Sequence, residues 1–356
     1  MSFSDPSVRD LVMRYGWNST AYQILNPGFS YWLSPTRTAV VGYVRKGRWW
    51  VAAGAPVCDA SELAAATTEF AAAASAVGCR VCYVCAAERL RNVLAHDSGH
   101  SIITIGAEPV WDPRAWPAVV KGRRSLRAQL HRARNKGVTI ERCDPCDAAG
   151  RQDLRNVLRE WLDRHGLPPM HFLVEPNVLD GEMRDRVLSV AKREGKAVAF
   201  LVASPVVTRQ GYLIEEIARG ANAPNGTAEL LIDAAMTELA RGGATYATLG
   251  LVALSYHARQ QMAANPRWFR LLTAWAHAHG RRFYHFDGLE AFRAKMHPDA
   301  WESIYVITNT PAFPLAALHA VARAFCDGSP ELALVAAIGK AARQEAAWLL
   351  RPRRRA

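Results

Sequence analysis

Apolar and polar residues recur along the chain in short blocks, and the period of each block predicts a strand or a helix. Blocks rich in β-branched and aromatic residues predict strands, whereas alanine-rich blocks with a period near 3.6 predict helices. In the first half we expect strands over Ala39–Val44, Arg48–Ala53, Arg80–Ala86, Ile102–Ile105 and Pro109–Trp111, and a helix over Ser61–Val77.

The second half repeats this mixed order. We expect strands over Val138–Arg142, Lys196–Ser204, Gly211–Arg219, Ala247–Leu251, Phe283–Phe286 and Trp301–Thr308. Helices are expected over Ala148–Arg164, Asp180–Glu194, Thr227–Arg241 and Pro266–His279. From Pro311 two tail helices follow; Ser329 and Pro330 begin the second, whose apolar stripe predicts docking on the domain or, alternatively, contact with a membrane surface.

The repeated order predicts a duplicated α/β (α+β) fold, and the length allows each half its own core. We expect domains at 1–120 and 138–310, a linker helix at 121–137 and a tail at 311–356.

The linker segment, Lys121–Lys136, is basic on most of its surface. Leu126, Leu130 and Ala133 share one helical face, and Gly137 follows as a helix terminator. The other faces carry Arg123, Arg124, Arg127, His131, Arg132, Arg134 and Lys136, with no acidic residue between them. Such a run is usually a solvated helix face, but the lack of acids favours contact with nucleic-acid phosphates.

Composition narrows the class of protein. Half of the 356 residues are hydrophobic, as in folded globular proteins. The net charge of +12 favours a polyanionic partner, either nucleic acid or an anionic membrane surface; an arginine-rich composition without functional cause is the alternative. The first residues do not form a signal peptide and no apolar run reaches the length of a spanning helix, so we expect a cytoplasmic location.

The cysteines do not predict a metal site. Seven cysteines fit a reducing compartment. Cys79, Cys82 and Cys85 have a spacing that zinc sites use, but a three-residue offset along a strand places successive thiols on opposite faces. The second pair, Cys143 and Cys146, lies far along the chain without a histidine pattern. We therefore expect buried structural cysteines and no metal.

The strand–loop–helix unit over 211–236 is the first candidate for chemistry. Its loop, Ala223–Thr227, places backbone N–H groups at a helix N-terminus, where anions bind; an ordinary connection between elements is the alternative. Glu216 and Arg219 precede this loop in an apolar strand. A regular strand would set them on opposite faces, whereas a bulge or the strand end would let them meet, as an active-site pair or as a structural ion pair.

Several short stretches in this order resemble one family, the C-terminal catalytic domain of the aminoacyl-phosphatidylglycerol synthases (multiple peptide resistance factor, or phosphatidylglycerol lysyltransferase, family). The resemblance spans roughly residues 20 to 308. Its stretches are Val41–Val44 with Gly54–Val57, Gly106–Val110, Arg124–Arg127 through Arg134–Gly137, Glu216–Arg219 with Ala223–Thr227 and Glu229, Leu249–Ser255, and Phe292–Lys295 with Pro298, Trp301 and Tyr305.

The resemblance implies tandem GNAT-like domains and transfer of an aminoacyl group, of the lysine or alanine class, from charged tRNA to the hydroxyl of phosphatidylglycerol or a related lipid. Glu216 and Arg219 fall on the family's Asp-x-x-Arg active-site pair; the Glu departs from that pattern. The resemblance also implies substrate binding by Asn225, Gly226, Thr227, Glu229, Ser255 and Lys295, and tRNA binding by Arg123, Arg124, Arg127, Arg132, Arg134 and Lys136.

This activity needs neither metal nor cofactor, because an aminoacyl ester is already activated; aminoacyl-tRNA is the co-substrate. The enzyme must align ester and acceptor, remove a proton and stabilise an oxyanion. Family members commonly carry a membrane flippase domain that this sequence does not show, so a peripheral position at the inner face of the membrane is expected if the acceptor is a lipid. Transfer to a soluble acceptor, an acyl-CoA N-acyltransferase and a non-catalytic RNA-binding protein are the alternatives.

Overall fold

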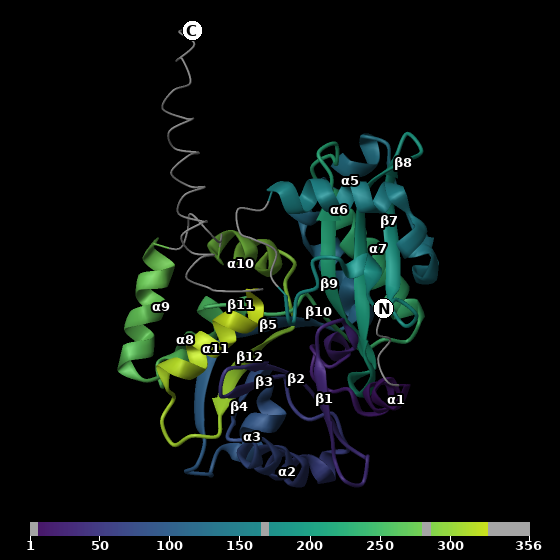
Figure 1. The fold of residues 1–356 in the computed structure, drawn as a ribbon. Coiled ribbons are helices and arrows are strands. Elements are labelled where there is room, and N and C mark those ends of the chain that lie inside the picture. The colour runs from purple at the N-terminus through teal and green to yellow at the C-terminus, as the bar shows by residue number, and fades with distance from the viewer. Residues whose placement is uncertain (1–5, 165–170, 280–285, 327–356) are drawn as a thin grey trace, which may run out of the picture.

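The computed structural model describes residues 6–164, 171–279 and 286–326, which form one mixed sheet with helices on both faces (Figure 1). Within these residues the sheet has 12 strands, in the order β1-β2-β3-β4-β12-β5-β10-β9-β8-β7-β6, with β11 paired to β5 outside this path. The strands are β1 Ser30–Leu33, β2 Val40–Lys46, β3 Trp49–Ala53, β4 Arg80–Ala86, β5 Ser101–Trp111, β6 Val138–Cys143, β7 Val187–Arg193, β8 Lys196–Val206, β9 Gly211–Arg219, β10 Tyr246–Thr248, β11 Val252–Ala253 and β12 Ala300–Thr308.

Helices cover both faces of this sheet. The α-helices are α1 Pro6–Tyr15, α2 Leu63–Ala76, α3 Glu88–Leu94, α4 Trp116–Gly122, α5 Arg124–Asn135, α6 Gln152–Arg164, α7 Thr227–Arg241, α8 Arg259–Met262, α9 Arg267–His279, α10 Phe286–Ala294 and α11 Leu315–Phe325. Short 3-10 turns join them: η1 Tyr22–Leu25, η2 Ala60–Glu62, η3 Pro113–Ala115, η4 Pro145–Gly150, η5 Val178–Asp180, η6 Val207–Arg209 and η7 Tyr256–Ala258. None of the helices in the described part of the chain has the length and hydropathy needed to cross a bilayer.

The predicted hairpin and the helix after it are confirmed. β8 and β9 pair antiparallel, and α7 begins at Thr227 and ends at Arg241, as the apolar period indicated. On one face of these strands α5 and α7 bury a core that includes Leu130, Leu231 and Ile214. On the other face α6 packs against Phe200, Val202 and Ala218.

The helix predicted over Asp180–Glu194 is wrong. After η5, this segment forms β7, which pairs with β6 and β8. Leu188 and Val190 pack in the α6 core, whereas Val187 and Ala191 pack in the α5–α7 core. A strand buried on both faces has a continuous apolar run without a period of two, so the sequence pattern did not distinguish it from a helix.

The two short strands predicted at Ile102–Ile105 and Pro109–Trp111 are a single strand, β5. Gly106 does not interrupt it; a Cβ at this position would lie 2.1 Å from the carbonyl oxygen of Val252. The glycine is therefore needed because β11 crosses close to β5, and not because the strand ends there.

The linker helix predicted at 121–137 is interrupted. Arg123 has extended backbone angles, φ −118° and ψ 99°, and separates α4 from α5. Gly137 follows α5 with φ +77°, as expected of a residue that terminates a helix. Of the other predicted elements, the strand at 283–286 and the tail helix at Ser329 and Pro330 lie wholly or mostly outside the described residues.

One strand connects the two halves of the molecule. β12, from the end of the second half, lies between β4 and β5 of the first half and pairs antiparallel with both. A division of the chain at 120 and 138 therefore separates β12 in sequence from the part of the sheet that it joins. The predicted domain boundaries stay a prediction.

Candidate active site

The sheet opens between β9 and β10. The two strands pair in parallel only over Gly211–Leu213 and Tyr246–Thr248; β10 then ends, and the chain crosses to pair as β11 with β5. β9 continues to Arg219 with β8 on one side, and no strand in the described part of the chain pairs with its other side beyond Leu213. We call this divergence the strand split. Along the split, the backbone groups of β9 that face away from β8 have no strand partner among the described residues.

A bulge on β9 determines which side chains face the same way. Val202 pairs with Glu216 and Ala203 with Ile214, so Glu215 is an extra residue in β9. The insertion places Glu215 and Glu216 on the same face of the sheet, the face covered by α6 and by the segment after α1. Two carboxyl groups are thereby brought together inside the protein.

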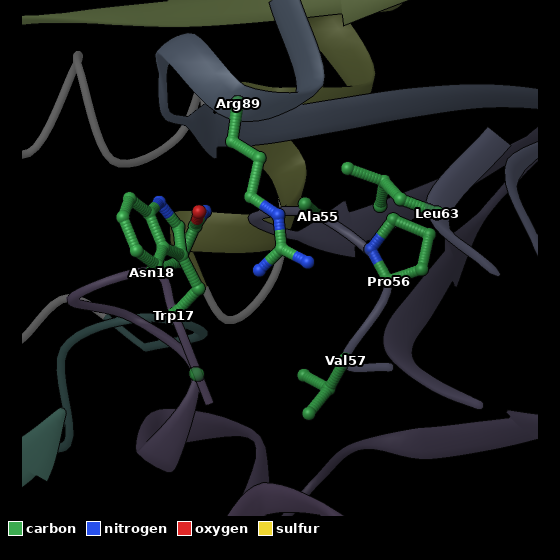
Figure 2. A pocket seen from close by; sticks show the side chains of 8 residues that line it. Trp17, Asn18, Ala55, Pro56, Val57, Leu63 and Arg89 are labelled. Carbon is green, nitrogen blue, oxygen red and sulfur yellow. The ribbon is translucent and has the colours of Figure 1, made fainter. Parts of the chain in front are cut away.

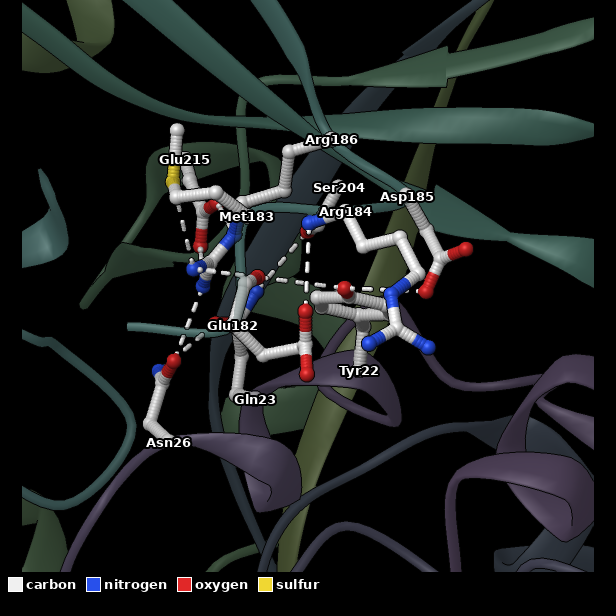
Figure 3. Close-up of polar contacts among 10 residues, drawn as sticks. All are labelled: Tyr22, Gln23, Asn26, Glu182, Met183, Arg184, Asp185, Arg186, Ser204 and Glu215. Carbon is white, nitrogen blue, oxygen red and sulfur yellow. Dashed lines mark hydrogen bonds and ion pairs between the residues drawn. The ribbon is translucent and has the colours of Figure 1, made fainter. Parts of the chain in front are cut away.

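Glu215 has a cationic partner (Figure 3). The guanidinium of Arg186, which is fully buried, lies 2.7 Å from its carboxylate and also donates to Asn26 Oδ1 at 2.9 Å. Gln23, from η1, donates to Ser204 Oγ on β8 at 2.9 Å. The segment after α1 therefore holds the Arg186–Glu215 pair against the sheet through several buried polar contacts.

Glu216 has no such partner. Its side chain is 9% exposed and pairs with no cation among the described residues; its carboxylate accepts a hydrogen bond from the backbone N–H of Ile217. Burial, followed by the nearby carboxylate of Glu215, raises the pKa of Glu216 to about 8. The group therefore holds its proton through most of the neutral range and is poised to exchange one near pH 8.

Arg219 lies on the opposite face of the sheet from Glu216, which is the alternative expected of a regular strand. The bulge precedes Glu216, and β9 is regular from Glu216 to Arg219, so the three-residue offset separates the two side chains. Arg219 is exposed at the end of β9, on the side where Ile217 contacts the α5–α7 core. The two residues cannot act as one adjacent acid–base pair.

The predicted loop lies at the N-terminus of α7, against α5. Gly226 has φ +94°, and a Cβ there would lie 2.2 Å from the carbonyl oxygen of Gln129 in α5. Thr227 is buried and its hydroxyl donates to Pro224 O at 2.7 Å, whereas Asn225 is exposed. Glycine is required here by both conformation and space.

The other predicted substrate contacts are engaged within the protein. Lys295 Nζ lies 2.6 Å from the buried carboxylate of Glu229, in the first turn of α7. Ser255 is buried; its hydroxyl donates to Glu290 of α10 at 2.8 Å and accepts from the N–H of His257. The structure brings Glu229 and Lys295 together, but as partners of each other, and gives Ser255 a role in capping η7.

A family model, "Phosphatidylglycerol lysyltransferase, C-terminal", matches residues 9–308. The chain belongs to this family. It is accordingly an aminoacyltransferase, and the mixed α/β fold class predicted from the sequence is confirmed. No curated protein matches the chain.

Several solved structures share this fold. A C-terminal domain described as that of a lysylphosphatidylglycerol synthetase from Agrobacterium fabrum is 24% identical, with a TM-score of 0.73 over 90% of this chain and 96% of that one. L-PGS from Bacillus licheniformis is 21% identical, with a TM-score of 0.75 over 91% and 96%. FemX is 10% identical, with a TM-score of 0.55 over 89% and 98%. These likenesses concern the fold.

The basic residues of α5 in this phosphatidylglycerol lysyltransferase family member are exposed except Arg127, which is half-buried. Arg127 donates to carbonyl groups at the end of α4, and Arg134 pairs with Asp233 of α7 at 2.9 Å. Arg123 contacts the ring of His297, and Arg132 donates to Gln129 at 3.2 Å. Among the described residues, Arg124 and Lys136 have no such partner.

Sequence reasoning gave no role to a second buried carboxyl group. Glu108 of β5 is 3% exposed and accepts a hydrogen bond from Ser19 Oγ at 2.7 Å; burial raises its pKa to about 7. It pairs in register with Glu302 of β12, whose carboxylate binds Arg209 at 2.7 and 2.5 Å. The sequence did show an acidic residue, Glu108, inside the apolar stretch Gly106–Val110. Its position near the strand split could not be predicted, because that position depends on the order of the strands in the sheet.

Proposed function

We propose that the chain transfers an aminoacyl group from charged tRNA to a hydroxyl of phosphatidylglycerol or a related lipid. The observation that carries this proposal is the strand split of a phosphatidylglycerol lysyltransferase family member: an edge of β9 without a strand partner among the described residues, beside a buried carboxyl group, Glu216, that pairs with no cation there. A ligand can bind along the free edge while a proton acceptor stays close to it.

In the proposed reaction the acceptor hydroxyl attacks the ester carbonyl, a new C–O bond forms, and the bond to the ribose oxygen of tRNA breaks. Glu216 in its ionised form, which becomes populated as the pH approaches 8, takes the hydroxyl proton and then gives it to the departing ribose oxygen. A base with a pKa near 8 is well matched to a hydroxyl that loses its proton only as the new bond forms. Unpaired N–H groups of the β9 edge would stabilise the oxyanion.

The face that carries α5 supports the tRNA part of the proposal. Exposed Arg219 and exposed basic residues of α5, including Arg124 and Arg132, belong to the same face of the second-half sheet. Such charges bind a phosphate backbone without reading its sequence. Under this proposal Arg219 holds the tRNA end, and Glu216 acts on the other side of β9.

An exposed helix supports a membrane surface as the source of the acceptor. α9 buries Phe269 but leaves Leu271 73% and Leu272 38% exposed, and exposed Arg267 and Arg270 lie on an adjoining sector of the helix. Apolar side chains beside arginines are typical of helices that lie in the interface of an anionic bilayer.

The test uses radiolabelled aminoacyl-tRNA, phosphatidylglycerol vesicles and purified protein. Label is expected to enter the lipid phase, to do so only with intact tRNA, and to be lost in Glu216→Gln. Exposed Glu69 on α2 provides the matched control, Glu69→Gln, which should transfer normally. Label in a water-soluble product, or transfer that survives RNase treatment, would contradict the lipid acceptor or the tRNA donor respectively.

A further inference from the structure

Three aromatic side chains lie together at η7, the turn that follows β11 beyond the strand split. The rings of His257 and Trp301 are stacked, with centroids 4.1 Å apart and an interplanar angle of 5°. The ring of Tyr256 stands at 87° to that of His257, with centroids 6.4 Å apart. We call these three rings the η7 aromatic cluster. Two of them come from the turn and one from β12, so the cluster exists only in the folded chain.

The cluster is open to solvent. Tyr256 is 64% exposed, and the side chain of His257 is 39% exposed although Trp301 covers one face of its ring. The exposure of His257 therefore comes from its other face and its edges. A single exposed ring is common at protein surfaces, but a stack with one open face can accept a further flat ring.

Hydrogen bonds fix the turn that presents these rings. Glu290 Oε1 accepts from Ser255 Oγ at 2.8 Å and from the N–H of Tyr256 at 2.9 Å. Ser255 Oγ accepts in turn from the N–H of His257 at 3.1 Å. Because the backbone on both sides of the rings is held in this way, a ligand that stacks there loses little affinity to ordering of the turn.

An aromatic ring beside an arginine does not by itself make a site, as a second position shows. In the first half Arg89 lies over the ring of Trp17, next to Pro56 (Figure 2). The space between these residues has room for about one water molecule, so it does not admit a base. The η7 aromatic cluster differs because its rings are stacked on each other and open outward.

The cluster faces the side of the sheet that carries the basic helix. Trp301 pairs in register with Pro109, two residues before Trp111 on β5, so Trp301 and Trp111 project to the same face. Trp111 packs in the α5–α7 core. His297, just before β12, contacts Arg123 at the start of α5, with 2.7 Å between Nδ1 and Nη2. The segment 297–301 thus connects the basic helix to the cluster.

The charge around the cluster suits an anionic strand. The sequence from Leu251 to His279 contains no Asp or Glu. Exposed Arg259 lies beside Tyr256, with its guanidinium carbon 4.4 Å from the ring centroid. The carboxylate of Glu290, which does reach η7, is engaged by Ser255 and by the backbone. Arg259 therefore supplies positive charge, whereas the rings supply a surface for stacking.

We propose that the η7 aromatic cluster stacks an unpaired base of the single-stranded 3′ end of tRNA, on the open face of His257 and beside Tyr256. This inference rests on the tRNA part of the proposed function. Unpaired RNA bases are recognised largely by stacking on aromatic side chains, which needs no particular base. α5 holds the phosphate backbone, and the cluster directs the chain end to the strand split.

Binding of two RNA hairpins to the full chain tests the cluster. One carries a four-nucleotide single-stranded 3′ end; the other carries the same end without bases, so that the phosphates are retained. Fluorescence anisotropy should show that the native protein binds the first roughly tenfold more tightly, as expected of one stacked base. His257→Ala should lose this preference, and His257→Phe, which keeps a flat ring, should retain most of it.

Salt dependence separates stacking from phosphate contact. His257→Ala should lower the affinity for the hairpin with bases by the same factor at every salt concentration, because stacking releases no counterions. A change of slope in this variant would mean that a phosphate contact was lost instead, and would overturn the proposal. His96→Ala, at an exposed histidine after α3, is the matched control and should bind as the native protein does.

Equal affinity of the native protein for the two hairpins, or an unchanged preference in His257→Ala, would also overturn the proposal. Weaker flotation with phosphatidylglycerol vesicles, at unchanged RNA binding, would assign the cluster to the membrane and refute it. The binding assay needs no transfer reaction. A base preference without label in the lipid therefore refutes only the proposed acceptor, whereas normal transfer without a base preference refutes only this inference.

Discussion

At the scale of single residues, the carboxyl groups near the strand split are distinguished by their partners. Glu215 is neutralised by Arg186, and Glu302 by Arg209, whereas Glu216 has neither a cation nor a hydrogen-bonding side chain within the described residues. A buried acid without a cationic partner costs folding free energy when it ionises. Such a cost at the edge of an open strand is typical of a functional site.

The first prediction concerns Glu216→Gln and the pH dependence of stability. The folded-state pKa, about 8, lies above the value near 4.5 of a free carboxyl group. The stability that Glu216 contributes is therefore complete below the lower value and is lost as pH rises towards about 8. Glutamine does not ionise, so the variant does not lose this stability. The difference in unfolding free energy, variant minus native protein, should therefore increase by a few kcal/mol between pH 5 and pH 9.

Urea unfolding at pH 5, 7 and 9 measures this difference. The exposed acid Glu69, changed to Gln, provides the control and should follow the native curve. Parallel pH profiles for Glu216→Gln and the native protein would show that Glu216 is not buried with a raised pKa.

At the scale of elements, α7 and α5 form a unit whose contact depends on one glycine. Gly226, with φ +94°, is the N-cap residue directly before α7 and lies against the backbone of Gln129 in α5. Arg134 of α5 pairs with Asp233 of α7, so the basic helix is fixed to the helix that follows the strand split. The position of the proposed tRNA surface relative to β9 is set by this helix pair.

Gly226→Ala should therefore destabilise the protein more than an ordinary substitution at positive φ. The backbone alone costs roughly 1–2 kcal/mol, and the new Cβ must also displace the carbonyl of Gln129. Gly243→Ala is matched, because Gly243 has φ +82° and open space around its Cβ position. Thermal unfolding should show the larger loss for Gly226→Ala, and equal losses would mean that the α5 contact carries no constraint.

The charge of α5 makes a separate prediction. Arg124→Glu with Arg132→Glu should weaken tRNA binding and reduce the magnitude of the slope of log affinity against log salt by roughly 1 to 2. The reason is that fewer phosphates are neutralised on binding, so fewer counterions are released. Neither residue is in an ion pair, so the fold should be preserved. Filter binding at several salt concentrations measures the slope.

The control for this experiment is Arg48→Glu with Lys196→Glu, two exposed positions outside α5 with the same total change of charge. An equal loss of slope in both variants would attribute binding to net charge alone. A slope unchanged by the α5 variant would remove α5 from the binding surface.

At the scale of the whole molecule, segments from each half of the described chain pack against the other half. β12 completes the sheet of the first half although it comes from the end of the second, and the segment after α1 reaches the sheet of the second half through Gln23 and Asn26. Connections in both directions predict that the two halves unfold together.

Ile307→Ala tests this coupling. Ile307 is fully buried on β12, and its truncation should cost about 2–5 kcal/mol. Hydrogen exchange should accelerate in β8 and β9 as well as in β4 and β5, and circular dichroism and tryptophan fluorescence should report one transition. Faster exchange confined to the neighbours of β12 would show that the halves unfold independently.

The features that the sequence predicted correctly are those that depend on residues close together in the chain. The β8–β9 hairpin, α7 and the apolar stripe of α5 depend on spacing within a few residues and were predicted. β7 was mistaken for a helix because burial on both faces erases the alternation of a strand. The bulge at Glu215 left no signal, so the sequence left open whether Glu216 and Arg219 would meet.

The sequence by itself determined the family, the helix and strand periods, the basic helix and the acids embedded in apolar strands, because these are properties of residue type and local order. Only the tertiary structure decided that Glu216 is buried without a cationic partner among the described residues, that Lys295 neutralises Glu229, and that β12 crosses into the first half. The reason is physical: burial and charge pairing depend on neighbours that are distant in the chain, and these become neighbours only when the strands are ordered.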